Sequence, residues 1–213
     1  MNILELFAGS RSIGKVGDSL GHNVFSVDVK DFDGINLVQD IEFLTADMIP
    51  FKPDMIWASP PCTTYSIAGI STHRHEGGMP KTEFAKKSDR LVYNTLKLIR
   101  ELDCIYYIEN PRGYMRKMNF MRGIPKTTVW YCKYGDKRAK PTDIWSNNIK
   151  NLFNLDGWQP REQCFNGNKM CHHEEAPRGS KTGTQGLKNN YERSKIPEEL
   201  CREIIEQTYN KLK

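Results

Sequence analysis

The sequence has no apolar run that approaches the roughly 20 residues of a membrane-spanning helix. Its first residues, Met1 to Glu5, lack the basic region and the cleavage site of a signal peptide. These two absences predict an intracellular protein with no membrane partner.

The cysteine content does not indicate a disulfide-stabilised protein. Six cysteines occur among 213 residues, with no secretion signal, and such a set is typical of free thiols. The excess of positive charge is small, because 31 Lys and Arg face 26 Asp and Glu, giving a net charge of +5. This charge permits a polyanionic partner without requiring one. The length suits one α/β domain with a small appendage.

Short apolar runs alternate with helical patterns along the chain. The strand candidates are residues 2–7, 24–27, 54–58, 104–108, 127–132 and 143–145, and the helix candidates are residues 12–20, 89–102 and 197–213. The last two strand candidates flank a polar run and predict a hairpin. Alternation of strands and helices predicts a mostly parallel sheet, whose ligands bind outside the carboxyl ends of the strands.

Polar turns follow the first two predicted strands. Gly9, in the turn after the first strand, lets a ligand approach the backbone closely because it has no side chain. By itself this turn is more often a ligand-free connection between strand and helix. Asp28 ends the second strand, where a carboxylate accepts hydrogen bonds from both ribose hydroxyls of an adenosine.

Two chemically reactive residues follow the next strands. Cys62 comes directly after Ser59-Pro60-Pro61, and a rigid double proline fixes the position of its thiol, a strong nucleophile once deprotonated. Glu109 follows another apolar strand and is expected in the same crevice, where an acid in a site of low polarity can donate to a ring nitrogen. The alternative for Glu109 is an ion pair with Arg112.

These motifs occur in the order seen in DNA (cytosine-5) methyltransferases, and the sequence resembles a compact, phage-type member of that family. The motifs that carry the resemblance lie within about residues 2–146 and are Phe7-Ala8-Gly9, Asp28, Asp40-Ile41, the run from Ser59 to Ser66, Glu109-Asn110-Pro111, Tyr134-Gly135 and Lys137-Arg138. The resemblance implies a Rossmann-like S-adenosylmethionine-dependent methyltransferase fold. It also implies action in the cytoplasm of a bacterium or of a phage-infected cell.

The resemblance implies a set of residues at the cofactor, S-adenosylmethionine. Phe7 is expected near the adenine together with Asp40 and Ile41, and Asp28 is expected at the ribose. The remaining expected cofactor residues are Ala8, Gly9, Ser10 and Pro61, with Gly9 and Ser10 at the methionine end.

It also implies the catalytic roles. Cys62 is expected to add to carbon 6 of a cytosine, while Glu109 assists at ring nitrogen 3 and Arg138 holds the base oxygen. Addition makes carbon 5 a nucleophile that takes the methyl group. Since a stacked cytosine is inaccessible in a duplex, this chemistry implies that the base is flipped out of DNA.

Several basic and hydroxyl residues are expected to contact duplex DNA. Residues 66–87 resemble the mobile loop that closes over DNA in the family, and a solvated loop is the alternative. The predicted contacts are Ser66, Arg74, Lys140, Arg178 and Lys181. The predicted organisation is a catalytic domain at 1–146, a small target-recognition region at 147–193 and a closing helix at 194–213, in a monomer without an obligate protein partner.

Three other functions compete with this prediction. Methylation of an exocyclic amino group usually places an aromatic residue where Cys62 stands. RNA methylation stays open, because a tRNA-modifying branch shares the fold and motifs. The third alternative is a non-catalytic DNA-binding regulator, which the presence of both Cys62 and Glu109 disfavours.

A zinc site is a further possibility in the target-recognition region. Cys164, Cys171, His172 and His173 contain metal-ligating groups, with Cys132 as a possible ligand across the fold. The Cys-six-residues-Cys spacing is not that of a standard zinc knuckle. The sequence therefore favours free thiols and no metal.

Overall fold

Seven strands form one sheet in the order β3-β2-β1-β4-β5-β7-β6. A computed structural model describes residues 1–175, 187 and 189–213. The strands are β1 (Asn2–Leu6), β2 (Asn23–Asp28), β3 (Leu37–Val38), β4 (Met55–Ala58), β5 (Ile105–Pro111), β6 (Lys126–Trp130) and β7 (Pro141–Ser146). Strands β1 to β5 pair in parallel, and β7 runs antiparallel to both β5 and β6. The predicted Rossmann-like, mostly parallel sheet with a terminal hairpin is confirmed.

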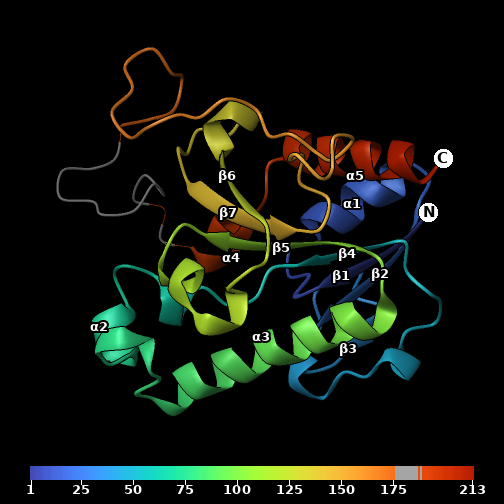
Figure 1. Ribbon diagram of the computed structural model, residues 1–213, viewed down its shortest axis with the longest axis horizontal. Helices are drawn as coiled ribbons and strands as arrows, with labels where there is room; N and C mark the ends of the chain where they lie inside the picture. Colours follow the sequence, from blue (N-terminus) through green and yellow to red (C-terminus); the bar gives the residue numbers. More distant parts are fainter. Residues whose placement is uncertain (176–186, 188) are drawn as a thin grey trace.

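The helices cover both faces of this sheet (Figure 1). They are α1 (Ser12–Ser19), α2 (Ile70–His73), α3 (Glu83–Leu102), α4 (Asn190–Ser194) and α5 (Glu198–Leu212). Short 3-10 helices lie in the connections, at η1 (Ile41–Phe43), η2 (Ala46–Met48), η3 (Thr63–Tyr65), η4 (Glu76–Gly78), η5 (Tyr114–Lys117), η6 (Asn119–Met121) and η7 (Tyr131–Tyr134).

Alternate residues of the strands build two separate hydrophobic layers. In β1, Leu4 and Leu6 pack on the side of α3, whereas Ile3 packs on the side of α1 and α5. β4 divides in the same way, with Ile56 on the α3 side and Trp57 on the other side. Because successive side chains of a strand point to opposite faces, both faces of the sheet are buried, as expected for a parallel sheet.

The residues after β7 have little regular structure. Between 147 and 175 there is no helix or named strand, only isolated bridges such as that of Ile149 with Trp158. Trp158 fixes this segment to the core, since its buried ring packs edge-on against Tyr107 and its indole NH donates to Glu203 of α5 at 3.0 Å. The division into a catalytic domain, a recognition region and a closing helix stays a prediction. No helix in the described residues is long and apolar enough to cross a membrane.

A buried carboxylate connects the first strand to its neighbours. Glu5 of β1 accepts hydrogen bonds from the Ile13 backbone NH of α1 at 3.0 Å and from the Ser26 hydroxyl of β2 at 2.8 Å. Burial raises the pKa of Glu5 from 4.5 to about 7, although these bonds and nearby Arg11 act in the opposite direction.

The shifted pKa of Glu5 predicts a stability change with pH. Since the folded pKa lies above the unfolded one, the penalty for ionising Glu5 is absent below about pH 4.5 and complete above about pH 7. One pKa unit corresponds to about 1.4 kcal/mol, so the unfolding free energy of the wild type, relative to Glu5→Gln, should fall by about 3 kcal/mol across this range. Urea unfolding at a series of pH values measures the difference. The exposed Glu206→Gln serves as control, and a flat Glu5→Gln difference would contradict the prediction.

Candidate functional site

The predicted cofactor residues meet at the carboxyl ends of β1 and β2. The Gly9 backbone NH donates to the Asp28 carboxylate at 3.0 Å, and the Ala8 NH donates to the Val27 carbonyl at 3.1 Å. After β3, the Gln39 NH donates to the Asp28 carbonyl at 2.9 Å, which brings Asp40 and Ile41 alongside. These contacts join three segments that are distant in sequence.

The turn after β1 is open to a ligand. Phe7 and Gly9 both have positive φ angles, of 57° and 47°, and this conformation is strained for any residue with a side chain. A Cβ atom built on Gly9 would have only the Phe7 carbonyl within 4 Å, at 3.9 Å, so the backbone is uncovered there. The buried hydroxyl of Ser10 lies 3.0 Å from that of Ser12, which accepts from the Ile196 NH at 3.1 Å.

Asp40 begins η1 and is fixed from two sides. Its carboxylate accepts from the Glu42 NH at 3.0 Å, as an N-cap, and from the Lys87 ammonium at 2.7 Å. Burial acts to raise the pKa of Asp40, but the hydrogen bond and charge of Lys87, with Glu42 and Arg90, lower it overall. Asp40 therefore presents a fixed negative charge beside Ile41, whose side chain is buried.

Cys62 lies at the end of β4, immediately before η3. The loop that holds it is tied to both neighbouring strands: the Ser59 NH donates to the Leu6 carbonyl at 3.3 Å, and the Asn110 amide donates to the Pro60 carbonyl at 2.9 Å. Asn110 Oδ1 is buried and has no hydrogen-bond partner among the described residues. The loop thus has a fixed position, and one acceptor beside it is free.

Glu109 and Lys140 lie close enough to Cys62 to influence its charge. Burial raises the pKa of the Cys62 thiol, and the negative charge of Glu109 raises it further, whereas Lys140 and Arg193 lower it. Glu109 is buried and accepts a hydrogen bond from the Tyr131 hydroxyl at 2.9 Å. Cys62, the predicted nucleophile, Glu109, its predicted acid partner, and Lys140, a predicted DNA contact, therefore lie close enough for their charges to interact. This group of side chains is called the pocket below.

Lys140 rather than Arg138 is the cation that faces this pocket. The Lys140 ammonium is buried, lies 4.5 Å from the centre of the Tyr131 ring and donates to the Arg193 carbonyl at 2.9 Å. Burial lowers the pKa of Lys140, and the charge of Glu109 opposes this effect. Lys140 also has a positive φ of 25°, a strained backbone geometry of the kind that accompanies functional positions.

Arg138, which the resemblance places at the base oxygen, is engaged by protein groups in this structure, and its contact with the base stays a prediction. Its guanidinium pairs with Asp136 through several hydrogen bonds and donates to the carbonyls of Glu192, Arg193 and Lys195, at 3.0 to 3.2 Å. These contacts attach the segment before α5 to the turn before β7. The side chain has a structural role in this arrangement.

Arg74, a predicted DNA contact, is also enclosed by protein groups in this structure. Its side chain is only 3% exposed, pairs with Asp89 at 2.7 Å and donates to the Thr64 carbonyl at 2.9 Å. The guanidinium also lies 4.3 Å from the centre of the Tyr65 ring, and the Tyr65 hydroxyl donates to Asp89 at 2.7 Å. A cation enclosed in this way holds the predicted loop of residues 66–87 against α3, and its contact with a phosphate stays a prediction.

Other cations lie where a polyanion can approach. Arg112 and Lys117 are exposed and line a hollow of about 340 Å³ between the loop after Cys62 and the loop after Glu109, together with Ile67 and Ile70. Nothing in the sequence except their position after a strand marks these two cations as possible DNA contacts. The half-buried hydroxyl of Ser66 donates to the Thr63 carbonyl and accepts from the Gly69 NH, each at 3.0 Å. Arg178 and Lys181 lie outside the described residues.

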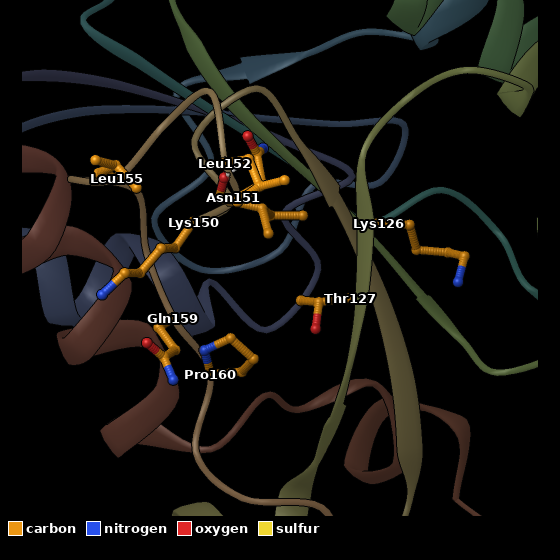
Figure 2. Close-up of a pocket in the computed structure, with 9 residues that line it drawn as sticks. Lys126, Thr127, Lys150, Asn151, Leu152, Leu155, Gln159 and Pro160 are labelled. Carbon is orange, nitrogen blue, oxygen red and sulfur yellow. Dashed lines mark hydrogen bonds between the residues drawn. The ribbon is translucent and has the colours of Figure 1, made fainter.

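A larger hollow, of about 610 Å³, is separate from these groups. Figure 2 shows Lys126 and Thr127 of β6 on one side of it, and Lys150, Asn151 and Leu152 of the following segment on the other. None of the residues predicted for catalysis or cofactor binding lines this hollow. The residues predicted for catalysis and cofactor binding lie instead near the carboxyl ends of the strands.

Comparisons with known proteins identify the family of the chain. A family model described as C-5 cytosine-specific DNA methylase matches residues 30–126, a range that contains Cys62 and Glu109. The chain is 32% identical over 171 residues to a protein of Frog virus 3 (isolate Goorha) named "Probable DNA (cytosine-5)-methyltransferase", with 76% of this chain and 74% of the relative covered.

Among solved structures, the chain is similar to a mutant of DNMT2 from Spodoptera frugiperda, with 16% identity and a TM-score of 0.46. That match covers 76% of this chain, which spans 55% of the length of the solved chain. A likeness at this level carries no argument about function.

The buried position of Arg74 predicts a loss of stability upon its replacement. Arg74→Met keeps an apolar stem but leaves Asp89 buried without its cation, which should cost about 3 to 5 kcal/mol. Chemical denaturation measures the change, and exposed Lys81→Met is the matched control. If Arg74→Met is as stable as the wild type but binds DNA more weakly, the result would instead support a phosphate contact of Arg74.

The charges around Cys62 predict opposite shifts in its reactivity. Lys140→Met removes a positive charge and should move the pH profile of Cys62 alkylation by iodoacetamide to higher pH, since the thiolate loses a stabilising partner. Glu109→Gln removes a negative charge and should move the profile to lower pH. Peptide mass spectrometry separates Cys62 from the other thiols. Shifts in the same direction for both variants would show that the two charges do not act on Cys62.

Proposed function

Because the chain belongs to the C-5 cytosine-specific DNA methylase family, we propose that it transfers a methyl group from S-adenosylmethionine to carbon 5 of a cytosine in duplex DNA. The observation that carries the proposal is the convergence of Cys62, Glu109 and Lys140 in one buried pocket, beside a turn that is open to a ligand.

The residues at the ends of β1 and β2 fit the cofactor. Uncovered backbone at Gly9 admits the methionine end, and the Asp28 carboxylate accepts from ribose hydroxyls. Phe7 and Pro61 are partly exposed and complete the site, and Asp40 and the backbone of Ile41 lie on the adenine side. When bound there, S-adenosylmethionine supplies an electrophilic methyl group.

The groups in the pocket act on the base in a defined order. The Cys62 thiolate adds to carbon 6 of the cytosine and forms a C–S bond, while the electrons of the 5,6 double bond move toward carbon 5 and the ring. Glu109 assists at nitrogen 3. We assign the contact with the base oxygen to Lys140, whereas the resemblance places Arg138 there. After methylation, solvent water takes the proton from carbon 5, the electrons of that C–H bond re-form the 5,6 double bond, and the C–S bond breaks to release Cys62 as a thiolate.

Burial strengthens each of these effects. Lys140 and Glu109 are held by hydrogen bonds before the base arrives, so little reorganisation is required as charge develops on it. The high pKa of Cys62 in the free protein means that few molecules carry the thiolate at neutral pH. A proton on Glu109, shared with nitrogen 3 of the base, would remove the repulsion that raises this pKa.

Duplex DNA is the proposed substrate because an exposed cationic surface borders the pocket. Arg112 and Lys117 lie beside it, and phosphates bind such side chains without sequence preference. The target cytosine must leave the stack to reach Cys62. Ser66 lies at the start of the same loop and is a candidate for one further phosphate contact.

The decisive experiment traps the protein on its base. Duplex DNA that contains 5-fluorocytosine should form a covalent adduct in the presence of S-adenosylmethionine, because fluorine on carbon 5 prevents release of Cys62. Denaturing electrophoresis and mass spectrometry detect the adduct. Cys62→Ala should abolish trapping, and Cys104→Ala, which changes a thiol outside the pocket, should not.

Matched RNA carrying 5-fluorocytosine separates the substrates. Trapping on RNA and not on any DNA would overturn the DNA assignment while keeping the cytosine-5 chemistry. Binding of DNA without trapping on either polymer would instead indicate the non-catalytic regulator.

A further inference from the structure

Four metal-ligating side chains that do not include Cys62 meet in the described part of the fold. They are Cys132 of η7 and three residues of the irregular segment that follows the sheet, Cys164, Cys171 and His173. The three sulfur atoms and a ring nitrogen of His173 all lie within 4.8 Å of one another. Three of the four residues are buried, and Cys171 is half-buried.

The spacing of these atoms suits a tetrahedral ion. With zinc–sulfur bonds of about 2.3 Å, the sulfur ligands of a tetrahedral site are about 3.8 Å apart. Cys164 Sγ is already 3.9 Å from Nδ1 of His173. The cluster therefore needs to contract by no more than about 1 Å to surround one ion.

The surrounding loop has features of a metal site. Asn168 closes a turn on the Phe165 carbonyl at 3.2 Å, with Gly167 at a φ of 80°, and its side-chain amide points at Cys164 Sγ at 3.5 Å. Amide groups that donate to a ligating sulfur orient it and stabilise its negative charge. The backbone NH of Cys171 then donates to the Asn168 carbonyl at 3.1 Å.

Free thiols alone explain this arrangement poorly. The apolar cluster at this point contains only Trp130, Cys132, Ala139 and Cys164, with Cys171 packed against it. A core of this size stabilises little, and the segment between 159 and 175 has no helix or strand to order it. A disulfide would use two of the sulfurs and leave a third thiol and His173 in the same small space.

We propose that Cys132, Cys164, Cys171 and His173 bind one structural zinc ion. The sequence favoured free thiols, because the ligand from η7 is distant and the Cys-six-residues-Cys spacing is not standard. Three thiolates with one imidazole are a set that zinc prefers, and four protein ligands leave no open position for a substrate.

The ion would attach the irregular segment to a turn that serves the catalytic pocket. Cys132 directly follows Tyr131, which holds Glu109, and the turn continues to Lys140. The Glu174 NH donates to the Lys137 carbonyl at 2.9 Å, which extends the attachment along that turn. Zinc therefore orders residues that touch both Glu109 and the proposed recognition region.

Metal analysis of the full chain, purified without chelator, tests the proposal. Inductively coupled plasma mass spectrometry should find one zinc per chain. Cys171→Ser and His173→Ala should lose it. His172→Ala is the matched control, because this neighbouring histidine is exposed and lies outside the cluster, and Cys104→Ser controls for loss of a thiol elsewhere. Both controls should keep the zinc.

Two further measurements decide the case if a variant fails to fold. Cys171→His retains a zinc ligand and should keep the metal. Wild-type protein stripped of metal and given Co²⁺ should show the intense visible bands of tetrahedral thiolate coordination. Wild-type protein without stoichiometric zinc, or retention of zinc by both Cys171→Ser and His173→Ala, would overturn the proposal. A disulfide between two of these cysteines in freshly prepared protein would also overturn it.

Discussion

A lysine ammonium buried beside a carboxylate and a thiol is the interaction on which the rest of this site depends. Lys140 lies in the same enclosed space as Glu109 and Cys62, and a buried charge is tolerated only where partners compensate for lost water. The partners come from separate parts of the chain: the Tyr131 ring after β6, the Arg193 carbonyl before α5 and Glu109 at the end of β5. The pocket can form only when these elements are assembled.

Because the pocket requires several segments to be held together, contacts outside it also matter for its structure. Arg138 fastens the segment of residues 192–195 to the turn before β7, and this segment supplies the carbonyl that receives Lys140. Arg74 has a similar effect on the opposite side, because its pairing with Asp89 fixes the residues that follow Cys62. Two arginines that look like ligands for phosphate thus hold the pocket in place, and the exposed Arg112 and Lys117 take the position next to the solvent.

The sequence predicted the sheet well, for a physical reason. Apolar runs mark strands, and the carboxyl ends of parallel strands share one edge, so Asp28, Cys62 and Glu109 lie along the same edge of the sheet. The two-residue strand β3 was missed because it is too short to show alternation.

The sequence could not show the partners of a side chain that has a choice of them. Arg138 and Lys140 are two residues apart, and only the fold shows that Asp136 captures the first and leaves the second to the pocket. Arg74 finds Asp89 on a helix that begins nine residues later. His172 and His173 are adjacent, and the direction of one turn decides which of them joins the cysteines. The local sequence pattern shows which strand, helix or turn a residue belongs to. Which partner its side chain contacts depends on the direction of that side chain in the folded chain.

The same reasoning explains how a small chain can fix a catalytic pocket without a large core around it. Preorganised charges lower a barrier only if they are held in place before the base arrives. Here the fixing is done by short-range polar contacts at three points: the Arg74–Asp89 pair, the Arg138–Asp136 pair and the cysteine and histidine cluster beside Tyr131. The first two fix the residues around Cys62 and Lys140. The zinc ion proposed above would add the third, next to the residue whose hydroxyl orients Glu109.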